Sequence, residues 1–201
     1  GLIVTSLLNL WAEEHKDACT ICVTGTKGKS TTSTLLGHVL QTMGKRALVL
    51  GNIGIPVSQA SEGPVDYYVI ETSSYQAANF SGSCHVAVLT SLFPEHLDWH
   101  GSLDLYYRDK SNLLLHSDVC AVSAAALKTL EEHHIDIGSN KTIFGQDDGW
   151  HCFDGTVYKQ ALPVGNIPYE FLTRPYNQDN VCAIMSVIDV LGLDTASAVA
   201  A

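Results

Sequence analysis

A short apolar run that ends in a glycine-rich turn is the feature that most restricts how this chain can fold. Residues 19–24 read CTICVT, an apolar and β-branched run that predicts a buried strand. Residues 25–29, GTKGK, contain two glycines, and the following STTSTLLGHVLQTMG has apolar residues at helical spacing. Gly44 stops that pattern, as glycine commonly does at a helix end. The segment therefore predicts a strand, a tight turn and a helix in direct succession.

The rest of the chain repeats this alternation of strand-length apolar runs and helical patterns. Further strands are expected at RALVLG, DYYVIET, HVAVLTSL and DVCAVS, and further helices at LDLYYRDKSNLLLH, AAALKTLEEHH and NQDNVCAIMSVIDVLGL. Near-continuous apolar strands that alternate with helices indicate a parallel sheet covered on both faces. Residues 141–172 instead have short alternating runs and several glycines, which predict a small antiparallel hairpin region.

We therefore predict an α/β fold with a phosphate-loop-type, mostly parallel sheet flanked by helices and the hairpin region near residues 141–172. Residues 1–18 are expected to form a lead-in helix, and residues 19–201 a single domain. A length of 201 residues with 46% hydrophobic residues suffices for one well-filled domain.

The composition excludes several classes of partner. A formal net charge of -10 argues against a nucleic-acid surface, which needs a positive field to hold phosphates. No apolar run approaches the roughly 20 residues of a membrane span, and no signal-peptide pattern starts the chain. The six cysteines lie mostly in apolar runs and are expected to be reduced. These features predict a cytoplasmic protein that binds neither nucleic acid nor membranes.

The turn at residues 25–31 has the composition of a phosphate-binding loop. It would direct backbone N–H groups and the positive end of a helix dipole to one point, where Lys29 adds a full charge. Ser30 and Thr31 supply hydroxyl oxygens of the kind that Mg²⁺ binds. The pattern departs from G-x-x-x-x-G-K-[ST], because Val23 stands where the first glycine would be. A glycine turn with a solvated Lys29 and a helix-capping Ser30 therefore stays open as an alternative.

Two polar stretches follow later strands. Glu71 begins ETSSYQ, and FPEHLDWHG contains Glu95, His96, Asp98 and His100. Ligands of a parallel α/β sheet bind at the carboxyl ends of its strands, so both stretches would share an edge with the glycine-rich turn. The alternative for Glu71 is a carboxylate that faces water, and the alternative for the second stretch is a polar loop with incidental histidines.

Lys110 and a pair of asparagines complete the candidate residues. Lys110 lies in the helical pattern YYRDKSNLLLH, where the sequence alone predicts a surface lysine. Asn177 and Asn180, in RPYNQDN, are three residues apart and would share one face of a helix. An N-cap role is the default interpretation of Asn177.

Taken in order, these features resemble the Mur ligase family, the ATP-dependent enzymes that form amide bonds in peptidoglycan synthesis. The resemblance covers nearly the whole chain and corresponds to the central ATP-binding domain of the family. GNIGIP at 51–56, ETSSYQ at 71–76 and the asparagine pair are most similar to the members that add D-glutamate. Tyr176 departs from their pattern, because those members usually have His at that position.

The resemblance implies roles for individual residues. Glu71 would be shared by two Mg²⁺ ions, and His96 would help to hold the second. Lys110 would be carbamylated by CO₂ and become a further anionic ligand, while Ser30 or Thr31 would supply a hydroxyl. Catalytic positions would be Lys29, Glu71, His96 and Lys110. Nucleotide-binding positions would be Gly25, Thr26, Lys27, Gly28, Lys29, Ser30 and Thr31 at the phosphates, with Asn177 and Asn180 at the adenine. Substrate-binding positions would be Asn52, Ser73 and His96.

The implied reaction begins when ATP phosphorylates the carboxylate of UDP-N-acetylmuramoyl-L-alanine to an acyl phosphate. The amine of glutamate, expected to be the D isomer, then attacks it. The UDP-binding and amino-acid-binding domains of the family would be absent from this chain, so we expect an inactive, monomeric fragment. Alternatives are a related ligase for another amino acid (an L-glutamate variant or a folylpolyglutamate-type synthetase), a phosphate-loop kinase or ATPase, and a non-enzymatic nucleotide-binding module.

Overall fold

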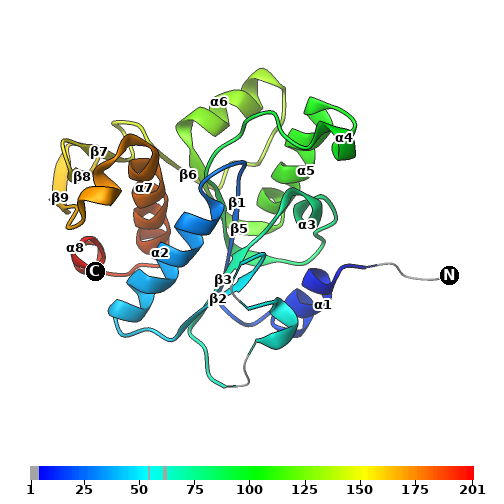
Figure 1. Ribbon diagram of the computed structural model, residues 1–201, viewed down its shortest axis with the longest axis horizontal. Coiled ribbons are helices and arrows are strands. Elements are labelled where there is room, and N and C mark those ends of the chain that lie inside the picture. Colours follow the sequence, from blue (N-terminus) through cyan, green and yellow to red (C-terminus); the bar gives the residue numbers. More distant parts are fainter. Residues whose placement is uncertain (1–4, 54, 61–62) are drawn as a thin grey trace.

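The computed structural model describes residues 5–53, 55–60 and 63–201. Positions 1–4 of the expected lead-in helix and Gly54 of GNIGIP lie outside the described residues. The described strands form one nine-stranded sheet in the order β2-β3-β1-β4-β5-β6-β7-β8-β9 (Figure 1). These strands are β1 Thr20–Thr24, β2 Ala47–Gly51, β3 Tyr67–Glu71, β4 Cys84–Leu89, β5 Ser117–Ser123, β6 Lys141–Phe144, β7 Trp150–Phe153, β8 Thr156–Lys159 and β9 Leu162–Asn166.

Helices connect most of these strands. The α-helices are α1 Leu7–Glu14, α2 Lys29–Thr42, α3 Ser74–Ala78, α4 Leu97–His100, α5 Leu103–Leu115, α6 Ala124–Glu132, α7 Pro175–Val190 and α8 Thr195–Ala200. Two short 3₁₀ helices are η1 Val57–Gln59 and η2 Glu170–Thr173. Within the described ranges, no helix combines the length and the apolar character that crossing a membrane requires.

The predicted mostly parallel sheet is confirmed. β1 lies between β3 and β4 and runs parallel to both, with Val23 opposite Glu71 on one side and Val88 on the other. β2, β5 and β6 continue the parallel arrangement outward. The carboxyl ends of β1, β3 and β4 consequently meet at one edge, where the residues that follow each strand come together.

The antiparallel part is smaller than the predicted region 141–172. β6 pairs in parallel with β5, and the pair Phe144 and Trp150 joins β6 to β7 in the same sense. Antiparallel pairing is confirmed for β7 with β8 and β8 with β9, which extend the main sheet. A tight turn between β6 and β7 is possible because Gly149 lacks a side chain. A Cβ there would lie 2.2 Å from the carbonyl oxygen of Ile143.

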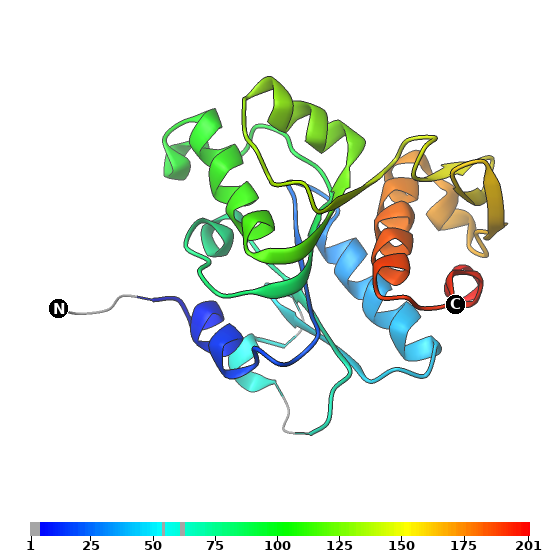
Figure 2. The ribbon, with the colours of Figure 1, turned by 180° about the vertical axis from the view of Figure 1, so that it is seen from behind.

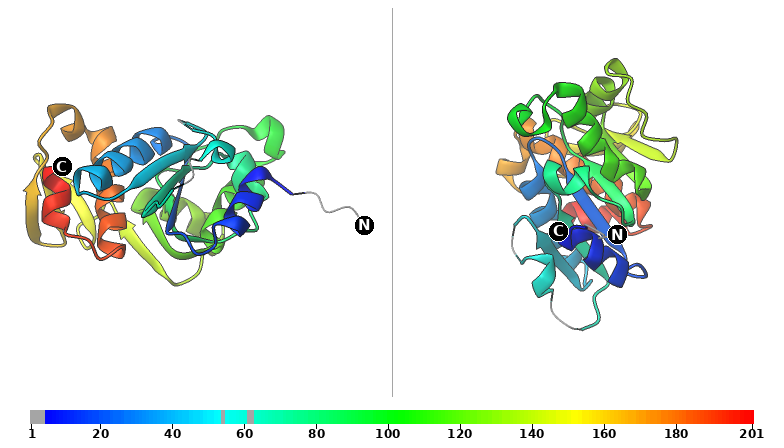
Figure 3. Two further views of the ribbon diagram at one scale, coloured as in Figure 1. Left: turned by 90° about the horizontal axis from the view of Figure 1, so that it is seen from below. Right: turned by 90° about the vertical axis from the view of Figure 1, so that its right-hand side faces the viewer.

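Helices cover both faces of the sheet (Figure 2). α1, α3, α5 and α6 pack on one face around residues such as Trp11 and Tyr106. α2, α7 and α8 pack on the other face around residues such as Leu36 and Met185. Figure 3 shows α8 beside β9, on the far side of the molecule from α1.

β1 supplies apolar side chains to both layers. Ile21 and Val23 belong to the core beneath α2 and α7, whereas Cys22 belongs to the core beneath α5. This alternation follows from the two-residue period of a strand and explains why the whole run is apolar. All six cysteines are free thiols.

Leu36→Ala is expected to lower the free energy of unfolding by about 2–5 kcal/mol, because the truncation leaves a cavity in the core. Leu36, on α2, is 0% exposed. Leu10→Ala is the matched control on α1, where Leu10 is 53% exposed, and should change the value by less than about 0.5 kcal/mol. Urea unfolding followed by circular dichroism measures both. Equal losses would contradict the placement of Leu36 in the core.

Candidate active site

The turn between β1 and α2 needs glycine at two positions. Gly25 and Gly28 have φ angles of +150° and +89°. A Cβ on Gly25 would lie 2.0 Å from Thr90 Oγ1, and a Cβ on Gly28 would lie 2.6 Å from Asn180 Oδ1. Thr90 Oγ1 also donates a hydrogen bond to the Lys27 carbonyl oxygen at 2.6 Å. The turn therefore lies directly against the end of β4 and against α7.

α2 starts immediately after this turn. Gly28 is its N-cap residue and provides no side-chain hydrogen bond, and Lys29 is the first helical residue. Ser30 lies inside the first turn of the helix, so the alternative in which Ser30 caps the helix is wrong. The first N–H groups of a helix lack partners in its own backbone, and an anion is the ligand that suits them.

Lys29 folds back over the turn. Its Nζ donates to the carbonyl oxygens of Gly25 and Thr26, each at 3.0 Å. Burial lowers the pKa of Lys29, while the carboxylates of Glu71 and Glu95 act in the opposite direction. A phosphate group at the start of α2 would therefore meet a positive charge that the turn already orients.

Glu71 ends β3 at the same edge of the sheet. The residue is 2% exposed, and its Oε2 has no hydrogen-bond partner among the described residues. The alternative of a water-facing carboxylate is therefore wrong. A buried carboxylate oxygen without a donor is costly, and a cation removes that cost. The side chain of Glu71 thus fits the role of a metal ligand.

His96 lies in the loop after β4, just before α4, with a φ of 54°. Its side chain is 44% exposed, and Nε2 lies 3.5 Å from Glu95 Oε2. Glu95 Oε1 in turn accepts a hydrogen bond from Lys27 Nζ at 2.7 Å. In the part of the chain that the structure describes, no three His, Cys, Asp or Glu side chains are grouped so that they could hold a metal ion. A metal role for His96 stays a prediction.

His100 holds the loop after β4 to two neighbouring helices. Its side chain is fully buried, Nδ1 lies 2.6 Å from Asp109 Oδ2 and Nε2 lies 3.0 Å from Ser74 Oγ. These contacts tie α4 to α5 and to the first residue of α3. The alternative of an incidental histidine therefore applies to His100, whereas Asp98 is exposed.

Lys110 is buried, in contrast to the surface position expected from the sequence. The residue is 2% exposed, and its Nζ donates to the Gly25 carbonyl oxygen at 2.8 Å. Burial, together with repulsion from Lys29, lowers the pKa of Lys110 to about 7, against an opposing attraction from Glu95. A large fraction of the amine is therefore neutral near pH 7, and the neutral amine is the nucleophilic form.

Asn177 and Asn180 join α7 to its neighbours. Asn180 Oδ1 accepts from Thr32 Oγ1 at 3.1 Å, and Asn180 Nδ2 donates to Asn177 Oδ1 at 3.2 Å. Asn177 Nδ2 donates to the carbonyl oxygen of Phe171 in η2 at 2.9 Å. The expected N-cap role of Asn177 is wrong, because α7 begins two residues earlier at Pro175.

A groove beside the turn was not predicted from the sequence. Tyr169 and Phe171 of the η2 region are 57% and 58% exposed, and with Leu172 they form one wall of an open groove of about 570 Å³. Ser30 and Thr31 lie on the opposite side. The aromatic residues of IPYEFL were the available signal, but they fell within the segment assigned to the hairpin region.

Two of the three predicted substrate-binding residues, Asn52 and Ser73, lie near Glu71. Asn52 follows β2, is exposed, and its backbone N–H donates to the Glu71 carbonyl oxygen at 3.2 Å. Ser73 caps α3, where its Oγ accepts from the Gln76 N–H at 3.2 Å. The structure brings both residues to the expected edge, and their contact with a substrate stays a prediction.

Comparison with solved structures gives the fold. The chain superposes on a UDP-N-acetylmuramate:L-alanyl-gamma-D-glutamyl-meso-diaminopimelate ligase from Neisseria meningitides with a TM-score of 0.72 and 20% identity, covering 94% of this chain and 67% of that one. A MurF ligase from Thermotoga maritima in complex with ADP gives a TM-score of 0.66 and 17% identity, covering 96% of this chain and 51% of that one.

Sequence comparison gives the family. A UDP-N-acetylmuramoyl-L-alanine--L-glutamate ligase of Xanthomonas campestris pv. campestris is 38% identical over 204 residues, and one of Salinispora tropica is 39% identical over 201 residues. These matches cover 94% and 95% of this chain but 42% and 43% of the relatives, so the chain spans less than half of their length. The family described as Mur ligase middle domain matches residues 23–153. The chain therefore belongs to the Mur ligase family, by its middle domain.

Proposed function

We propose that this chain is the ATP-binding part of a ligase that joins glutamate to UDP-N-acetylmuramoyl-L-alanine in peptidoglycan synthesis. The observation that carries the proposal is the convergence of Lys29, Lys110 and Glu71 on one glycine turn, with Glu71 Oε2 lacking a hydrogen-bond partner among the described residues. A turn that only bound phosphate would not need a second, buried lysine against its backbone. The names of the Xanthomonas and Salinispora relatives support the choice of substrates.

ATP would bind along the turn and the groove beside it. The N–H groups at the start of α2 and the ammonium of Lys29 suit the β- and γ-phosphates. The base would enter the groove between η2 and α2, where the exposed rings of Tyr169 and Phe171 offer apolar surface. Asn177 and Asn180 would support this wall from α7, since Asn177 holds the Phe171 carbonyl. The Thermotoga neighbour, which carries ADP, is in keeping with this ligand.

Two Mg²⁺ ions would bind at the same edge. The buried oxygen of Glu71, which has no partner in the described part of the chain, supports one ligand position. The hydroxyls of Ser30 or Thr31, His96 and a carbamylated Lys110 would supply others. Apart from the imidazole nitrogen of His96, these are hard oxygen ligands, which Mg²⁺ prefers. Bound Mg²⁺ neutralises charge on a phosphoryl group during its transfer.

Carbamylation of Lys110 would complete this set. The neutral amine attacks CO₂, a C–N bond forms, and the amine releases a proton to leave an anionic carbamate. Burial and the pKa of about 7 support this reaction, because they leave a large fraction of the amine neutral near pH 7 and shield it from bulk water. The product would place a negative charge beside Lys29, where the protonated amine would be a second positive charge.

In the reaction, the residues of this chain would bind ATP, orient its γ-phosphate toward the substrate carboxylate and offset the negative charge of the phosphates. The substrate carboxylate attacks the γ-phosphate of ATP, which gives an acyl phosphate and ADP. The amine of glutamate then attacks the acyl carbon, and phosphate leaves as the amide forms. Lys29 stabilises the charge that moves from the γ-phosphate to ADP, and the loop that carries His96 would border the substrate.

The isomer of glutamate is proposed from the relatives alone. The relatives are named for L-glutamate, which favours the L isomer over the D isomer expected from the sequence motifs. A monomeric state and a cytoplasmic location also stay predictions. A phosphate-loop kinase or ATPase outside the family is disfavoured by the family match at residues 23–153.

Lys29→Ala is expected to weaken binding of a non-hydrolysable ATP analogue with Mg²⁺ by about 10- to 100-fold, the worth of a lost hydrogen bond to a charged group. Isothermal titration calorimetry measures the affinity. Lys128→Ala is the matched control, because Lys128 lies on α6 with a side chain that is 78% exposed. An affinity of the Lys29→Ala variant within twofold of the parent chain would contradict the proposed phosphate site.

Isotope-labelled bicarbonate is expected to produce a carbamate signal in the NMR spectrum of the parent chain. The signal should grow as the pH rises through about 7 at constant CO₂ pressure, because deprotonation exposes the reactive amine of Lys110. Lys110→Met should abolish the signal, and Lys128→Ala should retain it. A signal that survives in Lys110→Met, or none in the parent chain under saturating CO₂, would rule out this modification.

A further inference from the structure

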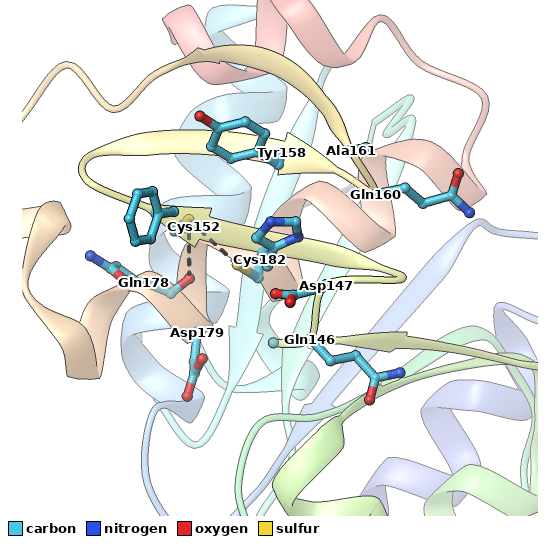
Figure 4. A pocket seen from close by; sticks show the side chains of 12 residues that line it. Gln146, Asp147, Cys152, Tyr158, Gln160, Ala161, Gln178, Asp179 and Cys182 are labelled. Atoms are coloured by element: carbon cyan, nitrogen blue, oxygen red, sulfur yellow. Dashed lines mark hydrogen bonds between the residues drawn. The ribbon is translucent and has the colours of Figure 1, made fainter.

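Two thiols from different elements face each other at the antiparallel end of the sheet. Cys152 on β7 and Cys182 on α7 place their Sγ atoms 3.5 Å apart. Both line a cavity of about 510 Å³ (Figure 4). Polar neighbours in the lining are Gln146, Asp147, Gln178 and Asp179. The pair therefore borders a space in which a small polar molecule can reach sulfur.

The pair differs from the other cysteines in its surroundings. Cys22, Cys84 and Cys120 are at most 3% exposed and lie in the core on the opposite face of the sheet. Cys182 is equally buried, but Cys152 is only half-buried and lies at the cavity. An accessible thiol with a buried thiol directly behind it is the arrangement of an attacking and a resolving cysteine.

The two thiols also differ in acidity. The hydrogen bond from Cys182 lowers the pKa of Cys152, against the effects of burial and of Asp179. The same contact, together with burial, raises the pKa of Cys182. Cys152 therefore loses its proton first, and the thiolate is the form that attacks an oxidant.

We propose that Cys152 and Cys182 form a reversible oxidation site for small hydroperoxides. The Cys152 thiolate attacks the outer peroxide oxygen and the O–O bond breaks. The leaving group takes up the proton that the thiol released and departs as an alcohol or water. The resulting sulfenic acid is attacked by the sulfur of Cys182, and its oxygen leaves as water with the thiol proton. The two thiols lose two electrons to the peroxide, and the sulfurs close from 3.5 Å to the disulfide length of about 2 Å.

The disulfide would act on the helix that borders the glycine turn. Figure 1 shows α7 between α2 and the antiparallel strands. Cys182 is two residues beyond Asn180, whose Oδ1 accepts from Thr32 on α2 and lies beside Gly28. Drawing Cys182 toward β7 pulls this part of α7 away from α2. We therefore expect the oxidised chain to bind the nucleotide more weakly. This consequence rests on the proposed function, whereas the oxidation site itself does not.

Treatment of the reduced, folded chain with stoichiometric hydrogen peroxide tests the site. Remaining thiols are then alkylated under denaturing conditions, and the peptides are mapped by mass spectrometry. We expect a bond between Cys152 and Cys182 that dithiothreitol reverses. Cys182→Ser and, as a second variant, Cys182→Ala should accumulate a sulfenic acid at Cys152 that dimedone traps. Cys19→Ser, which removes another half-buried thiol, should still form the bond.

Several outcomes would overturn the proposal. These are a disulfide between a different pair, sulfinic acid at Cys152 of the parent chain without a disulfide, or no oxidation of Cys152 while Cys19 reacts. The mapping in the parent chain needs no variant, so misfolding of a variant does not obscure it. Titration of the oxidised and reduced chains with the ATP analogue tests the consequence. Equal affinities would refute the coupling through α7, and a disulfide that forms in a chain unable to bind ATP would refute the proposed function alone.

Discussion

The contact between Gly25 and the end of β4 is the constraint on which the candidate site depends. With no side chain at Gly25, the turn after β1 packs against Thr90, and its carbonyl oxygen is left pointing at two lysines. Lys29 from α2 and Lys110 from α5 both donate to that oxygen, at 3.0 Å and 2.8 Å. Any larger residue would collide with Thr90 Oγ1 and displace the acceptor that both lysines share. One missing side chain thus brings α2, β4 and α5 to a single point.

The buried charged groups near Gly25 lower the stability of the fold. Glu71 is buried with an oxygen that no donor of the described residues reaches, and Lys110 is buried with a strongly lowered pKa. Leaving polar groups in this condition destabilises a fold, so their retention is better understood as preparation for ligands than as support for the core. His100 differs from Glu71 and Lys110, because both of its ring nitrogens have partners within hydrogen-bond distance, Asp109 and Ser74. These contacts hold the loop after β4 in place.

α7 connects the two ends of the domain, and every residue from Cys182 to Ile188 in its middle is buried. One face presents Asn177 and Asn180 to η2 and to the start of α2, while Cys182 meets Cys152 on β7. A helix held between the glycine turn and the antiparallel strands transmits a displacement at one contact to the other, because packed interiors are stiff. A displacement of the antiparallel strands, which extend the main sheet, can therefore reach the site through α7. None of these strands contributes a predicted site residue.

The sequence by itself determined the alternation of strands and helices, the glycine turn, the family, and the edge at which Glu71 and His96 would lie. These features are local or follow from parallel strand order, so periodicity and motif order suffice to find them. Only the tertiary structure decided that Lys110 is buried, that Asn177 follows the start of α7, that Tyr169 and Phe171 face the turn, and that Cys152 meets Cys182. Each of these depends on which distant element covers a given face. The spacing of apolar residues shows that a helix or strand has an apolar face, but only long-range packing decides which distant element covers that face.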